Sequence, residues 1–250
     1  TLFIKGENML KNNLGIISPS SEIQTVDNLE LMRQMKLYTM NKIIVGWNID
    51  ADLEVLPYLQ NYALGIQDCM IRFSRVANSF FDKKHKDRPF IDLKKAATMI
   101  GRSDELDWHN ALSDSIMVSF LWNHCDRHNF PRDYLMCLEI ENSLNNPKPQ
   151  QLYLELTKDE MEFNHQVRFD HCRQRHKFRK PNPPYKFLEG YSDEKWIYLN
   201  EKHKSLDHVF LDIESFPQNG LWVPREVALI DGCSGETLIH VYVKHEEITK

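Results

Sequence analysis

The chain has 250 residues, of which 42% are hydrophobic, enough to form the core of one large domain or two small ones. Its formal net charge of −5 argues against general electrostatic attraction to nucleic acid, although it leaves room for a local basic patch. Five scattered cysteines without a paired framework favour a reducing, intracellular setting. No apolar run approaches the roughly 18 residues that span a bilayer, so we expect a soluble domain without a membrane partner.

The first part of the chain predicts a helix followed by a strand. A polar stretch ends near Ser20 or Ser21, either of which is placed to cap a helix that contains Asp27 and runs to about Leu37. A short β-branched run at 42–48 then predicts a buried strand that is ended by a glycine.

Acidic residues follow directly on this predicted strand. The α/β folds build sites at the carboxyl edge of a sheet from such positions, which makes Asp52 a candidate ligand. Capping is the simpler alternative, because Asp50 or Asp52 can satisfy the first-turn amides of the next helix. Both interpretations stay open from these residues alone.

The middle of the chain contains the clearest helix, over residues 108–122. A strand is predicted before it at 70–73, and a shorter helix at 94–100 is stopped by Gly101. Asp114 lies among apolar residues of the long helix, where an ionised carboxylate is costly unless it is paired or bound to metal. A lone histidine such as His109 is usually structural, but beside an inward acid it becomes a candidate general base.

Residues 123–206 carry two ambiguous features. The first is a basic run from Arg168 to Lys180 with interleaved aromatics, which either follows a phosphate backbone or forms a solvated helix face. The second is a set of ligands for a structural Zn²⁺ that lacks a standard finger spacing, with exposed histidines and inert thiols as the alternative. These ligands are Cys125, His128, His165, His171, Cys172 and His176. The runs 134–140 and 151–156 suit either helix or strand.

The last part of the chain predicts an antiparallel meander of three strands, 210–215, 226–231 and 237–243, with a turn at 232–235. Its first strand carries Asp212 and Glu214, whose side chains point to the same face. Two like charges side by side repel each other, and a divalent cation between them removes that penalty. The alternative is an edge strand whose acids face water.

Together these segments resemble the DEDDh 3′–5′ exonucleases of the ribonuclease H-like superfamily. The run Leu211-Asp212-Ile213-Glu214 looks like the first motif, Asp-x-Glu, and the segment from Asn48 to Asp52 is similar to the second. The run Ile91-Asp92-Leu93 resembles the Asp-Thr/Leu step before the third motif. The segment from His109 to Asp114 matches the third motif, His-x-Ala-x-x-Asp.

The resemblance implies an α/β fold, a ribonuclease H-like mixed sheet flanked by helices, and cleavage at single-stranded DNA or RNA 3′ ends. The implied ligands of two Mg²⁺ or Mn²⁺ ions are Asp52, Asp114, Asp212 and Glu214, and His109 would take the proton of the attacking water. Terminal bases would stack on Trp47, Trp108, Phe216 or Trp222, unless these aromatics belong to the core. The rival interpretation is a catalytically inactive module that binds RNA or a protein partner.

The order of the motifs departs from the family, because the first-motif strand comes last. Three explanations stay open: a circular permutation, parts of two successive domains, or strand exchange between two copies, as in a homodimer. We therefore expect the second and third motifs in 1–122, a connector or small subdomain in 123–206, and the strands of the first motif in 207–250. These strands would complete the same exonuclease domain or a neighbouring one.

Overall fold

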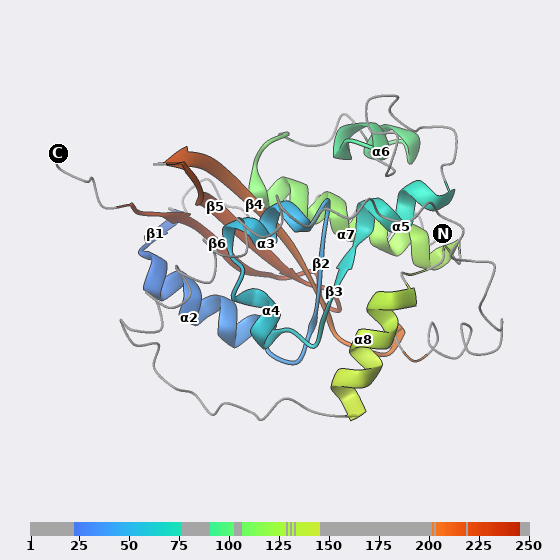
Figure 1. Cartoon of the computed structure of the whole chain (residues 1–250). Helices are drawn as coiled ribbons and strands as arrows, with labels where there is room; N and C mark the ends of the chain where they lie inside the picture. Colours follow the sequence, from blue (N-terminus) through green and yellow to red (C-terminus); the bar gives the residue numbers. More distant parts are fainter. Residues whose placement is uncertain are drawn as a thin grey trace.

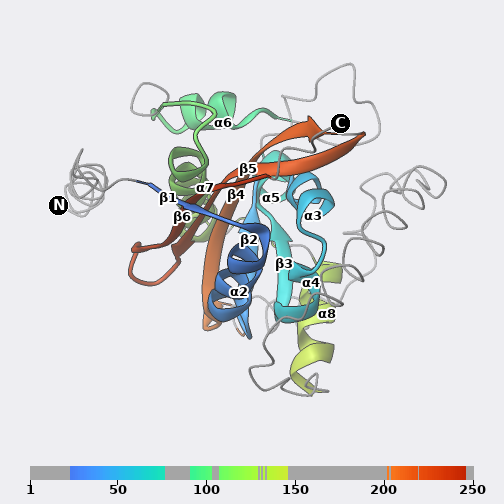
Figure 2. The ribbon, with the colours of Figure 1, turned by 90° about the vertical axis from the view of Figure 1, so that its left-hand side faces the viewer.

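The computed structural model describes residues 23–76, 91–102, 107–145 and 202–245, apart from 129, 131, 133, 203 and 219. Within these ranges a six-stranded mixed sheet lies between layers of helices, as Figures 1 and 2 show, so the expected α/β class is confirmed. The elements are, in chain order, β1 (Gln24–Val26), α2 (Asn28–Thr39), β2 (Ile43–Gly46), α3 (Asp50–Val55), α4 (Leu59–Tyr62), β3 (Gly65–Asp68), α5 (Cys69–Val76), α6 (Leu93–Met99), α7 (Ala111–Arg127), α8 (Tyr134–Asn145), β4 (His208–Gln218), β5 (Leu221–Asp231) and β6 (Thr237–Val243).

The sheet brings the two ends of the sequence together in the order β1-β6-β5-β4-β2-β3. The antiparallel meander of β4, β5 and β6 is confirmed. Strand β4 also pairs in parallel with β2, with Ile43 opposite His208 and Val45 opposite Phe210. The strand with the Asp-x-Glu run and the strand before Asp52 are therefore neighbours in one sheet of one chain (Figure 1).

Two hydrophobic cores lie on the two faces of the sheet. Leu211 and Ile213 of β4 belong to the core that α2, α3 and α4 cover. Phe210 belongs to the other core, which is built with α5, α6, α7 and α8. Because successive side chains of a strand alternate in direction, Asp212 and Glu214 point to the same side as Phe210, the side of α7.

The first helix begins later than the sequence predicts. Asp27 caps α2 from outside, since its Oδ1 accepts a hydrogen bond of 2.8 Å from the backbone N–H of Glu30. The expected cap at Ser20 or Ser21 and the placement of Asp27 inside the helix are therefore wrong, and residues 24–26 form β1 instead. The two serines themselves lie outside the described residues.

The strand expected at 70–73 is also wrong, because these residues lie in α5. Met70 and Phe73 are spaced for one face of a helix, and both are buried. The strand, β3, comes just before, and Asp68 at its end accepts hydrogen bonds from the backbone N–H groups of Met70 and Ile71. Short apolar runs suit either element, and here the capping acid starts a helix.

The helix expected at 108–122 is present as α7 but begins at Ala111 and extends to Arg127. Gly101, with φ +77°, follows the end of α6, and the run 134–140 belongs to α8. The run 151–156 and the basic run from Arg168 to Lys180 lie outside the described residues. No helix in the described ranges has both the length and the apolar character needed to cross a membrane.

Candidate metal centre

The predicted site residues converge on the part of β4 that extends beyond β2. The register joins β2 to β4 only as far as Val45 and Phe210, so Asp212 and Glu214 lie just past that contact. Helix α3 follows β2 directly and packs against β4. Asp52 of α3 is buried and accepts a hydrogen bond from the backbone N–H of Ile213. The Asp52 carboxylate thus accepts the hydrogen bond of a β4 backbone N–H that lies beyond the residues paired with β2.

Three of the predicted residues approach one another closely. His109, Asp114 and Glu214 each offer a ligand atom, and these atoms lie within 4.8 Å of one another. Asp114 projects from the first turn of α7, and His109 is exposed on the loop before it. This group can hold a metal ion, because carboxylate oxygens and an imidazole nitrogen are ligands of divalent metals.

Asp114 lies in an environment that disfavours its charge. Burial, together with the negative charge of Glu214, raises the pKa of its carboxyl group to about 7. The nearby His109 acts in the opposite direction, through its charge and through a hydrogen bond from its backbone N–H. The Oδ1 atom of Asp114 is buried and has no hydrogen-bond partner, which is unusual for a carboxylate oxygen.

Asp212 and Asp52 belong to the same group of charges. Burial raises the pKa of Asp212 well above its usual range, and the charges of Asp52, Asp114 and Glu214 act in the same direction. Burial likewise raises the pKa of Asp52, with the charges of Asp68 and Glu214 adding to it. His109, Asp114 and Glu214 thus lie within 4.8 Å of one another, and Asp52 and Asp212 lie close enough for their charges to act on this group.

The described part of the chain supplies no arginine or lysine ion pair to the four acids of this cluster. Like charges in a buried place are unfavourable unless a cation balances them. The excess of carboxylates and the unpartnered Oδ1 of Asp114 both fit a bound metal ion. The N-cap residue of α3, Ile49, provides no side-chain cap, and the Asp52 carboxylate accepts hydrogen bonds from its own first-turn N–H and from the N–H of Ile213 on β4, so capping and a place in the cluster are both compatible with its position.

Two acids of the cluster were missed by the sequence analysis. Glu226 on β5 lies directly opposite Glu214, is only 2% exposed, and raises the pKa of both Asp114 and Asp212. Asp68 ends β3, and burial raises its pKa to about 7. An acid at the carboxyl end of a parallel strand is a candidate site residue, and Asp68 has this position at the end of β3. The sequence predicted the strand at 70–73 instead, so Asp68 came before the predicted strand and was not considered. Glu226 is the first residue of the strand predicted at 226–231, and nothing in that run marks it as part of a site.

Asp68 supports the turn that leads to Asp52. Its Oδ1 accepts a hydrogen bond of 3.2 Å from the backbone N–H of Asn48, a residue with φ +55°. A non-glycine residue in this left-handed region needs such support from its surroundings. Asp92, by contrast, is the cap of α6 and accepts from the N–H of Lys95.

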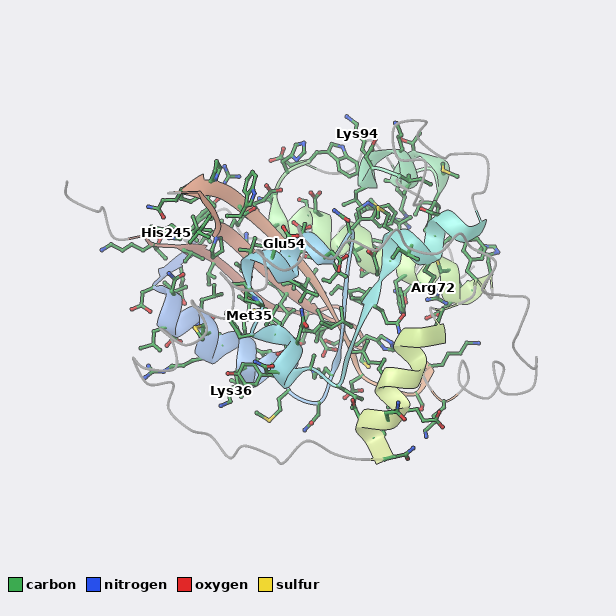
Figure 3. All side chains as sticks on the ribbon, viewed as in Figure 1. Met35, Lys36, Glu54, Arg72, Lys94 and His245 are labelled. Atoms are coloured by element: carbon green, nitrogen blue, oxygen red, sulfur yellow. The ribbon has the colours of Figure 1, made fainter. Side chains whose placement is uncertain are left out.

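The aromatic candidates have different surroundings. Trp47 donates its Nε1–H to the carbonyl of Ile91 at 3.0 Å and packs against the core on the α7 side. Trp108 also packs there. Phe216 contacts the ring of His245, which Figure 3 labels near the end of β6, and Trp222 is 52% exposed. Phe216 and Trp222 are thus the two that lie outside both cores.

The Cys125 to His128 segment supplies no metal site in the described residues. Cys125 is buried in the core, where burial raises its thiol pKa to about 12, so the thiolate that zinc needs is disfavoured. The rings of His124 and His128 lie next to each other, with centroids 4.4 Å apart and an interplanar angle of 44°. The other predicted zinc ligands, from His165 to His176, lie outside the described residues.

Comparison of the chain with family models, with curated proteins and with solved structures found no match. Function must therefore be inferred from the residues and their geometry.

Proposed function

We propose that this chain is a metal-dependent 3′–5′ exonuclease of the DEDDh type. The observation that carries the proposal is the convergence of His109, Asp52, Asp114, Asp212 and Glu214, which are scattered in the sequence, at one place in one chain. The unpartnered Oδ1 of Asp114 supports a metal-bound state of this cluster.

The sheet supports a ribonuclease H-like fold in a circularly permuted form. Strands β5 and β6 extend the sheet on one side of β4, and β2 and β3 extend it in parallel on the other. Joining the last residue to the first puts the strands in the order β4, β5, β6, β1, β2, β3, with the first motif on the first strand. The β2–β4 pairing within one chain favours this permuted domain over strand exchange between two copies.

The proposed roles follow from the position of each side chain. Asp52, Asp114, Asp212 and Glu214 would hold two Mg²⁺ or Mn²⁺ ions, which when bound lower the pKa of water and stabilise a leaving oxygen. His109 is exposed beside Asp114 and Glu214, so it can accept the proton of an attacking water. The substrate would be a single-stranded 3′ end of DNA or RNA, with terminal bases stacked on Phe216 or Trp222.

The proposal is tested with 3′-labelled single-stranded DNA and RNA of one sequence in Mg²⁺ or Mn²⁺. We expect release of labelled nucleoside monophosphate and a rate reduced on the order of 10²–10⁴-fold by His109→Ala, with a comparable or larger loss for Asp212→Asn or Asp52→Asn. Asp50→Asn is the matched control, because Asp50 is an exposed acid on the same helix as Asp52, and it should keep nearly full activity. Binding of the strand without any cleavage would refute the enzyme and favour an inactive binding module.

A mixing experiment separates the permuted domain from strand exchange. The Asp212→Asn and His109→Ala variants carry their defects on β4 and before α7, respectively. If each site forms within one chain, a mixture of the two inactive variants, unfolded and refolded together, stays inactive. Recovery of about a quarter of the wild-type activity would show that the strand completes the site of another copy.

A further inference from the structure

Glu226 is a buried carboxylate at the border of the proposed active site. It lies on β5 opposite Glu214 and is 2% exposed. Its Oε1 accepts a hydrogen bond of 3.1 Å from Nδ2 of Asn110 and lies 2.9 Å from Nε2 of His240 on β6. This one oxygen therefore joins β5 to β6 and to the residue that precedes α7.

Asn110 uses both ends of its side-chain amide. Its Oδ1 accepts from the backbone N–H of Ser113 at 3.1 Å and so caps α7, while its Nδ2 donates to Glu226. A carboxylate can only accept hydrogen bonds, so Glu226 sets the direction in which the Asn110 amide points. The first turn of α7 is thereby tied to the sheet next to Glu214.

His109 is the residue that this tie affects most directly. It is exposed and has φ +65°, a left-handed conformation that a non-glycine residue keeps only when its surroundings hold it. The next residue, Asn110, is extended, with φ −120° and ψ 121°. Fixing the Asn110 side chain therefore fixes the chain on one side of His109, and with it the approach of the imidazole to Asp114 and Glu214.

The charge of Glu226 is hard to explain by packing alone. It lies among carboxylates whose protonated forms it favours, and a buried like charge of this kind is unfavourable for folding. A neutral residue of similar shape would avoid this repulsion. What this position supplies is one acceptor oxygen that reaches Asn110 and His240 at the same time.

We propose that Glu226 is a positioning residue of the exonuclease, which acts through Asn110 to hold His109 beside Asp114 and Glu214. This inference rests on the proposed function, because the position of His109 matters for catalysis only if the histidine is the base. Glu226 itself is not assigned contact with the substrate or the reacting atoms.

The test reverses the hydrogen bond between positions 110 and 226. Asn110→Asp keeps an oxygen that caps α7 but turns an acceptor toward the Glu226 acceptor, so we expect kcat to fall by about 10–100-fold with KM changed less than threefold. Glu226→Gln alone is measured beside it, as the second single variant against which the double variant is compared. Combining the two substitutions places an amide donor at position 226 against a carboxylate acceptor at position 110, and this double variant should recover kcat to within about threefold of wild type.

A second readout does not depend on cleavage. The ring resonances of His109, followed by nuclear magnetic resonance in the free protein, should shift in Asn110→Asp and return in the double variant. An inactive wild type would refute the proposed function. With an active wild type, a double variant no better than Asn110→Asp, or His109 resonances that Asn110→Asp leaves unchanged, would refute the positioning role. Asp126→Asn is the control for a general loss of stability in α7. It weakens the end of the helix that lies away from Asp114, and it should leave kcat of the folded protein unchanged.

Discussion

The two ends of α7 treat a carboxylate in opposite ways. Asp126 in the last turn accepts hydrogen bonds of 2.6 Å from Arg72 and 3.0 Å from Arg132, and these two guanidinium groups hold its pKa below the usual range. Asp114 in the first turn faces other acids, and burial raises its pKa to about 7. One helix thus carries a balanced acid, Asp126, whose charge is paired with two arginines, and an unbalanced acid, Asp114, which has no such pair among the described residues.

The helix dipole does not explain this difference. A carboxylate is favoured at the N-terminal end of a helix and disfavoured at the C-terminal end, by about 0.3–1 kcal/mol. Asp114 has the favourable position and still has a raised pKa, whereas Asp126 has the unfavourable position and a lowered one. Burial and neighbouring charges decide both cases. The chain supplies its own cations at Asp126, whereas the described residues supply no arginine or lysine ion pair to the cluster around Asp114.

The largest effect on stability is expected at the balanced end. Asp126→Asn leaves the buried Arg72, labelled in Figure 3, and the buried Arg132 without their carboxylate, so the free energy of unfolding should fall by about 3–5 kcal/mol. Urea unfolding measures this change. Asp92→Asn is the control, because it alters an exposed helix cap and should lower the free energy by about 1 kcal/mol or less. A loss at Asp126 no larger than that would mean that its ion pairs are not structural.

The second prediction concerns pH in the absence of metal. The native carboxyl of Asp114, with a pKa of about 7, binds its proton more tightly than the unfolded one near 3.8, so rising pH removes stability between these values and has no further effect above about 7. The loss should be about 2–4 kcal/mol, measured by urea unfolding in EDTA from pH 4 to 8. Asp114→Asn should flatten the curve. A wild-type free energy that rises from pH 5 to 7 would contradict the prediction.

Asp126 contributes to the same curve with the opposite sign. Its native pKa lies below the unfolded value, so the stability that it provides is present at neutral pH and is lost as the pH falls toward the native pKa. Asp126→Asn should therefore weaken the protein more at pH 7 than at a pH below about 3.8, the value of the unfolded carboxyl. The two variants together separate the two ends of the helix.

Metal binding should reverse part of the pH-dependent loss. Bound Mn²⁺ needs deprotonated carboxylates, and at a hundred times its dissociation constant each bound ion should add about 2.7 kcal/mol to the free energy of unfolding at pH 8. The increase should be absent in Asp212→Asn and preserved in Asp50→Asn. An equal increase in all three proteins would show that the ion binds elsewhere.

The smallest expected effect is a gain in stability. Asp114→Asn removes a buried charge that faces Glu214, so the metal-free protein at pH 8 should become more stable by about 1–2 kcal/mol, while we expect the proposed exonuclease activity to be lost. Thermal unfolding in EDTA measures the gain. A metal-free variant that is less stable than wild type would show that Asp114 is held by interactions within the chain.

The sequence was sufficient where local chemistry decides the structure. Alternating apolar residues predicted the β4–β6 meander, a β-branched run predicted β2, and Gly101 ended α6. The acid pair at Asp212 and Glu214 was also visible, because two residues on alternate strand positions must share a face. These features need only a few neighbouring residues.

The sequence was insufficient where tertiary contacts decide. The roles of Glu226 and Asp68 depend on which strands are neighbours and in what register, and no local pattern gives that. The balance at Asp126 depends on Arg72, which lies on a different helix and was assigned to a strand. The order of the motifs left three alternatives open, namely a permuted domain, parts of two domains and strand exchange. Only the structure shows that β4 and β2 pair within one chain.

The most direct test of the metal site is to count the Mn²⁺ ions that the protein binds at pH 8, by equilibrium dialysis or by electron paramagnetic resonance. We predict two ions for the wild-type chain and for Asp126→Asn at a temperature where it is folded, and loss of at least one ion in Asp114→Asn and in Asp212→Asn. A wild-type chain that binds no Mn²⁺ at millimolar concentration would contradict the claim that the cluster of carboxylates is balanced by metal.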